Sequence, residues 1–171
     1  MRDVYWRKMF RFRYQIYYLY CCYRRVLWTN RIVKIVSAFL SSAAIAAWAN
    51  WTNLAFLWGL IIVVSQVASA VYEFLPYKKR AEALVALINQ YELLAIQVEK
   101  KWREIDMDES ISDKEINDLI AEYDTQWTMF GNKALGNDDL PQNEKFKDKA
   151  TKKAKEYFAC NLAGEVGNEK E

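Results

Sequence analysis

The sequence predicts an all-α protein: a membrane-embedded helical hairpin preceded by an N-terminal interfacial helix and followed by a C-terminal cytosolic helical domain. Three observations predict this fold class. The 38 residues from Ile35 to Tyr72 carry no charge, and a spanning helix needs roughly 20 apolar residues, so this length suits two crossings. Basic residues flank this stretch on both sides. Beyond Pro76, apolar residues recur at the spacing of amphipathic helices.

Residues 1–34 form a basic, aromatic segment with a net charge of +8. Tyrosine, tryptophan and phenylalanine alternate with arginine there, which predicts a helix over residues 3–28 that lies along the membrane surface or packs against the hairpin. Anionic lipids attract such segments, by roughly 1 kcal/mol per basic side chain, so membrane lipid is an expected partner. A single-stranded nucleic acid could use the same mixture; we favour lipid and expect no binding of duplex DNA. Cys21 and Cys22 are either acylated or simply two small interfacial side chains.

Residues 35–73 make up the expected two-span hairpin. The spans are Ile35 to Trp51 and Leu54 to Tyr72, with the turn near Asn50 to Asn53. Lysine and arginine accumulate on the cytoplasmic side of spans, so we expect both termini to be cytoplasmic, at a bacterial inner membrane. The alternative, a buried hairpin in a non-membrane fold, would hide too much uncharged chain inside 171 residues.

The expected spans contain few polar side chains, and these suggest helix packing rather than transport. Small residues four apart, including Ser42 in the first span and Ser65 with Ser69 in the second, allow helices to approach closely in lipid. Gln66 would seek a hydrogen bond in another helix or line a pore. Neither span holds an acid or a base, so a proton relay is disfavoured. From the small residues spaced four apart we expect a homo-oligomer, a tetramer.

Residues 74–163 are expected to fold as a cytosolic sensor or binding domain of three helices, followed by a frayed tail over 164–171. The first helix covers Arg80 to about Ile105. Ser112 and Glu115 predict a capping box that starts the second helix. A loop is expected from Gly131 to Pro141, and the last helix from Gln142 to Leu162. The apolar faces of these helices are predicted at Leu84, Leu87, Tyr91, Leu94, Val98, Trp102, Ile116, Leu119, Ile120, Tyr123, Trp127, Phe130, Phe146, Ala150, Ala154, Tyr157 and Phe158.

Catalysis finds little support in the sequence. The chain has no histidine, which removes the commonest general base and a frequent zinc ligand. It also lacks a Gly-rich phosphate loop, a nucleophile elbow and a Cys-x-x-Cys pair. Asp138 and Asp139 are better explained as loop or capping residues than as metal ligands. We therefore expect no enzyme, no catalytic residues, no cofactor and no metal.

Six lysines between positions 145 and 155 form the best candidate binding surface. Lys145, Lys149, Lys152 and Lys153 fall mainly along one side of the last predicted helix. Such a surface binds phosphates, although a solvated face with neighbouring acids has the same pattern. Arg103 and Lys133 are further candidates.

The order of segments along the chain resembles that of a known group of proteins. The basic aromatic N-terminus, the short hairpin and the continuation FLPYKKRAEALVALINQYELLAIQVEKKW at Phe74 to Trp102 resemble the small two-helix membrane effectors of bacterial anti-phage systems. These include the SLATT proteins and the CRISPR-associated membrane effectors that respond to cyclic oligoadenylate. The resemblance implies that a cyclic oligonucleotide, cyclic tetra-adenylate first, binds the domain from Arg80 onward and that the hairpins then disrupt the membrane.

The sequence also fits two other functions. A membrane-anchored adaptor would bind a protein partner through exposed parts of the faces around Trp102, Trp127 and Phe130. A holin-like pore former needs no ligand, but the patterned helices after Pro76 exceed what that role requires.

Overall fold

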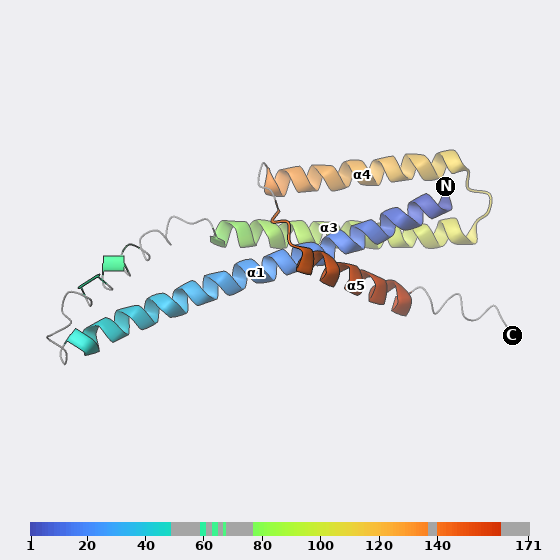
Figure 1. Ribbon diagram of the computed structural model, residues 1–171. Coiled ribbons are helices and arrows are strands. Elements are labelled where there is room, and N and C mark those ends of the chain that lie inside the picture. The colour runs from blue at the N-terminus through green and yellow to red at the C-terminus, as the bar shows by residue number, and fades with distance from the viewer. Residues whose placement is uncertain (49–58, 61–62, 65–66, 68–76, 137–139, 162–171) are drawn as a thin grey trace. The chain divides into compact units, whose positions relative to one another are not determined.

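The structure is a computed structural model that describes residues 1–48, 59–60, 63–64, 67, 77–136 and 140–161. Its long helices are α1 (Arg2–Trp48), α3 (Tyr77–Met107), α4 (Asp113–Leu135) and α5 (Glu144–Asn161) (Figure 1). The chain divides into two units: residues 1–23 with 82–171, and residues 24–81. The all-α expectation is confirmed.

The expected membrane hairpin is contradicted. Among the residues that the structure describes, no helix combines the length and the apolar character that crossing a bilayer requires. Within α1 (Arg2–Trp48) the described uncharged residues run from Ile35 to Trp48. The expected turn near Asn50 to Asn53 lies outside the described residues, as does most of the second span. The second unit contains the end of α1 and the start of α3. Some of its apolar side chains are exposed, such as Trp28, which is 66% exposed.

The N-terminal segment was expected to lie along the membrane surface or to pack against the hairpin, but its residues 1–23 pack within the first unit. Residues 1–23 belong to the first unit, where α1 buries Tyr5, Met9, Phe12, Ile16 and Leu19. These positions alternate in steps of four and three, the spacing of a helix that packs against other helices. The stripe that was expected to face lipid faces α3, α4 and α5 instead.

Helices α1 and α3 form the inner pair of the first unit and run antiparallel. At one end Arg2 donates a hydrogen bond to the Asp108 carbonyl, and further along α1 the Tyr20 hydroxyl donates to Glu92. Between these ends the Tyr5 hydroxyl donates to the Val98 carbonyl at 3.0 Å. The predicted apolar face of α3 is confirmed, with these residues buried: Leu84, Leu87, Tyr91, Leu94 and Val98.

Helix α4 packs against this pair and begins where the sequence predicts. Ser112 Oγ accepts a hydrogen bond from the Glu115 amide, and the Glu115 carboxylate accepts one from the Ser112 amide, so the predicted capping box is confirmed. The predicted start of the following loop is wrong, because Gly131 lies inside the helix. The helix ends at Gly136, whose φ of 56° requires the left-handed conformation that glycine adopts most readily.

Helix α5 packs across α1 and α3 through a polar contact as well as apolar ones. Ala150, Ala154 and Phe158 are buried. Arg13 donates hydrogen bonds to the Glu99 carboxylate and to the Tyr157 hydroxyl at 2.8 Å, and the same hydroxyl donates to Glu99 at 2.9 Å. The Arg13 and Glu99 side chains are only 10% and 15% exposed, so each charge depends on the other for compensation.

We expect Arg13→Met to lower the free energy of unfolding by about 3 kcal/mol, because it leaves the Glu99 carboxylate partly buried without its cation. Arg13→Met combined with Glu99→Leu should lose less than Arg13→Met alone, since no unpaired charge remains. Urea denaturation of the variants measures this. Additive losses in the double variant would contradict the prediction.

Candidate functional site

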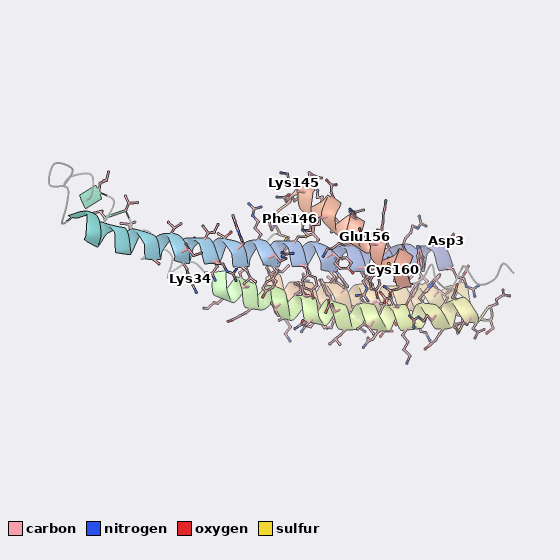
Figure 2. The ribbon with its side chains drawn as sticks, turned by 90° about the horizontal axis from the view of Figure 1, so that it is seen from below. Asp3, Lys34, Lys145, Phe146, Glu156 and Cys160 are labelled. Atoms are coloured by element: carbon pink, nitrogen blue, oxygen red, sulfur yellow. The ribbon has the colours of Figure 1, made fainter. Side chains whose placement is uncertain are left out.

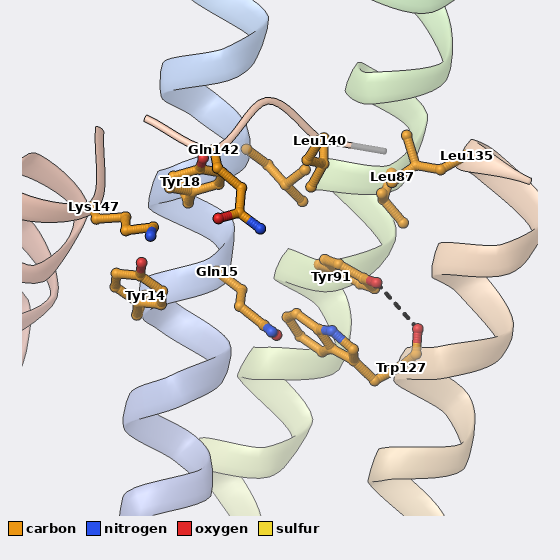
Figure 3. A pocket seen from close by; sticks show the side chains of 11 residues that line it. Tyr14, Gln15, Tyr18, Leu87, Tyr91, Trp127, Leu135, Leu140, Gln142 and Lys147 are labelled. Carbon is orange, nitrogen blue, oxygen red and sulfur yellow. Dashed lines mark hydrogen bonds between the residues drawn. The ribbon is translucent and has the colours of Figure 1, made fainter. Parts of the chain in front are cut away.

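A cavity in the first unit lies between α1, α3, α4 and the α4–α5 connection (Figure 3). Its volume of about 370 Å³ is at the small end of the range for ligand pockets, about 300–1,000 Å³. Every long helix of this unit contributes to its lining, which consists of Tyr14, Gln15, Tyr18, Leu19, Leu87, Tyr91, Trp127, Leu135, Leu140, Gln142 and Lys147. We call this cavity the aromatic pocket.

A stack of three rings builds the inner wall of the aromatic pocket. Trp127 of α4 lies between Phe12 of α1 and Tyr91 of α3, with ring centroids 4.3 Å and 3.5 Å away. The Tyr91 hydroxyl donates a hydrogen bond to the Trp127 carbonyl at 3.1 Å (Figure 3). Burial raises the pKa of Tyr91 to about 12. This wall is therefore uncharged at neutral pH.

The facing wall is formed by tyrosines of α1 that hold the α4–α5 connection. The Tyr18 hydroxyl donates to the Pro141 carbonyl and accepts a hydrogen bond from the Asn143 amide. Tyr18 also meets the Phe146 ring edge-on. These contacts hold the start of α5 against α1 and so position Gln142 and Lys147 at the pocket.

Besides the polar groups of its aromatic residues, the aromatic pocket contains two side-chain amides and one cation. Figure 3 shows Gln15 and Gln142 between the two aromatic walls, with Lys147 beside Tyr14. Lys147 Nζ donates to Glu144 at 2.8 Å, and this contact raises the pKa of Lys147. Burial raises the pKa of Tyr14, so its hydroxyl remains a donor. The pocket thus offers ring surfaces for stacking, amides for hydrogen bonding and an ammonium group for an anion.

The residues expected to bind phosphate lie outside this pocket. Lys145, Lys149, Lys152 and Lys153 are exposed on α5, as are Arg103 on α3 and Lys133 on α4, and none of them lines the cavity. Lys153 lies over the Tyr17 ring, 5.8 Å from its centroid. Figure 2 shows Lys145 and Phe146 at the start of α5 and Cys160 at its end.

Sequence reasoning named Lys147 only as part of a run and left it out of the candidate set. A signal was present, because Lys147 precedes the buried Ala150 and Ala154 by three and seven residues and shares their side of the helix. The lysine that lines the aromatic pocket is therefore the one on the same side of α5 as the buried alanines.

The other sequence candidates divide between described and undescribed parts of the chain. Ser65, Gln66 and Ser69 lie outside the described residues, and for Ser42 the structure describes only the helical backbone. The aromatic face that suited an adaptor is largely packed inward: Trp127 is 9% exposed, Trp102 stacks on Tyr5, and Phe130 is half-buried.

The geometry defines a helical bundle with a small ligand-type pocket, and within the described residues no group of acids or cysteines could hold a metal ion. No protein-family model, no curated protein and no solved structure matches the chain. The site must therefore be interpreted from its own chemistry.

Gly131 lies next to the ring stack, so the stack can be tested by combining Gly131→Ala with Tyr91→Phe. A Cβ added at Gly131 would lie 2.8 Å from the Tyr91 hydroxyl oxygen. Although alanine favours a helix by up to about 1 kcal/mol, we expect Gly131→Ala to lower the free energy of unfolding by about 1 kcal/mol, because the stacked Tyr91 cannot move away. In a Tyr91→Phe background the same change should stabilise. Denaturation of the four proteins measures the coupling; no coupling would show that Tyr91 lies elsewhere.

The raised pKa of Tyr91 predicts a loss of stability at alkaline pH. The folded state favours the neutral phenol, so this contribution is complete below pH about 10, the ordinary tyrosine value, and is lost as pH rises towards about 12. Over that window the unfolding free energy of Tyr91→Phe should fall by about 2 kcal/mol less than that of the wild type. Equal falls in denaturation experiments at both pH values would contradict this assignment.

Proposed function

We propose that the first unit is a receptor for a nucleotide second messenger, and that the aromatic pocket accepts one adenosine unit of a cyclic oligoadenylate. The observation that carries the proposal is the combination of ring surfaces, two amides and Lys147 in one cavity. Bases stack on aromatic side chains, with about 1–3 kcal/mol per base, and a glutamine amide can form paired hydrogen bonds with adenine N6 and N7. Cyclic oligoadenylate is the first ligand to test, because it combines adenine bases that can stack with phosphates that a lysine can bind.

The size of the pocket limits how such a ligand binds. About 370 Å³ suits a nucleoside-sized group rather than a whole cyclic tetranucleotide. A cyclic ligand with several bases would then be shared by several copies of the chain, each taking one base. The expected homo-oligomer fits this arrangement, and no catalytic step is required of the protein.

Lys147 is the expected contact for a phosphate. It approaches the pocket from the first turns of α5 and is paired with the exposed Glu144. A phosphate would replace this surface ion pair, which contributes little by itself, with a charge-assisted hydrogen bond. Binding should therefore weaken as the salt concentration rises.

The test is calorimetric titration of the full-length protein with cyclic tetra-adenylate, linear tetra-adenylate and adenosine monophosphate. We expect the cyclic ligand to bind most tightly. Lys147→Gln should weaken binding by about tenfold or more, the usual worth of a charge-assisted hydrogen bond.

Lys155→Gln is the matched control, because Lys155 is an exposed lysine of the same helix that does not line the pocket. No binding of any adenine ligand by the folded wild type would refute the proposal. If Lys147→Gln and Lys155→Gln weaken binding equally, the ligand does not bind in the aromatic pocket.

A further inference from the structure

The exposed surface of α5 carries a row of three lysines that the aromatic pocket does not use. Lys145, Lys149 and Lys152 are all exposed and are separated by four and then three residues, so they form one line along the helix. Their side of α5 is opposite the one that holds the buried Ala150 and Ala154. Within the described part of the chain, Lys145 and Lys149 have no ion-pair partner, and Lys152 has only Glu156 at 3.9 Å. We call this line the basic row.

Helix α4 carries a complementary line of acids. Glu115, Asp118 and Glu122 are exposed and are separated by three and then four residues. They line a surface groove of about 410 Å³ together with Leu119, Ile111 and Lys101. The ammonium group of Lys101 is already paired with Glu104 at 2.7 Å. We call this line the acidic row.

The two spacings match when the helices run antiparallel. Lys145 then faces Glu122, Lys149 faces Asp118 and Lys152 faces Glu115, over the same helical rise of about 10.5 Å. One turn further on, Glu156 would face Ile111 rather than another acid. In the parallel sense the two outer pairs would still match, but the middle pair, Lys149 with Asp118, would be offset by one residue, about 1.5 Å of helical rise.

From this match we infer that the basic row of one copy docks on the acidic row of a second copy of this chain. The partly buried Leu119 and Ile111 give the groove an apolar floor on which the methylene stems of the lysines lie, while their charged ends reach the carboxylates. Each pair is solvent-exposed and contributes about 0.2–1 kcal/mol. The three pairs together contribute at most about 3 kcal/mol, so burial of the apolar floor must supply the rest of the association free energy, and the association depends strongly on salt. It is independent of whether the aromatic pocket binds a nucleotide.

A charge-swap experiment tests this inference on the full-length protein by sedimentation velocity at low and high salt. We expect the wild type to self-associate at low salt and to dissociate at high salt. Lys145→Glu with Lys149→Glu should raise the dissociation constant about tenfold or more, because two attractions become repulsions. Asp118→Lys with Glu122→Lys should do the same.

The combination of all four changes should restore self-association, since the rows are again complementary, and an equimolar mixture of the two double variants should also associate. Lys79→Glu with Lys100→Glu is the control: both lysines are exposed on α3, and the net charge changes equally. A wild type that stays monomeric at low salt would overturn the inference. So would a combined variant that fails to reassociate while its helical circular dichroism is unchanged.

Discussion

The position of Trp127 between Phe12 and Tyr91 is the contact on which the first unit depends, because it joins α1, α3 and α4 at one point. Stacked rings contribute about 0.5–1.5 kcal/mol per pair beyond the area they bury, and they also set the separation of the three helices. Gly131 follows from this constraint, since the Tyr91 hydroxyl occupies the space that a side chain would need. Two of these rings, Tyr91 and Trp127, line the aromatic pocket. Core and site are therefore one structure, and a substitution in the stack should alter both.

Helix α5 has three surfaces with separate roles. One packs on α1 and α3 and includes Tyr157, which shares hydrogen bonds with Arg13 and Glu99. A second brings Lys147 to the aromatic pocket. The third presents the basic row to solvent. Because these surfaces use different residues, ligand binding and self-association can be changed independently, which makes the two proposals separable.

The errors of the sequence-based fold have a common physical origin. A run without charge measures composition, whereas a span also needs a long apolar helix, and the described helices do not include one. Likewise, an aromatic stripe with steps of four and three suits a lipid surface and a helical bundle equally well. The stripe from Tyr5 to Leu19 is buried because α3, α4 and α5 cover it. Whether such a stripe faces lipid or other helices depends on which segments pack against it, and the periodicity of a single helix does not show this.

The sequence by itself determined the helical class, the apolar face of α3 and the start of α4, because periodicity and the Ser112–Glu115 capping box act over a few neighbouring residues. It also placed the lysines of α5 on a charged surface. Only the tertiary structure decided that Arg13 pairs with Glu99, 86 residues away, that Gly131 lies under Tyr91, and that among those lysines Lys147 lines the aromatic pocket. The reason is that these contacts join segments distant in the chain, and packing rather than local preference selects which side chains meet.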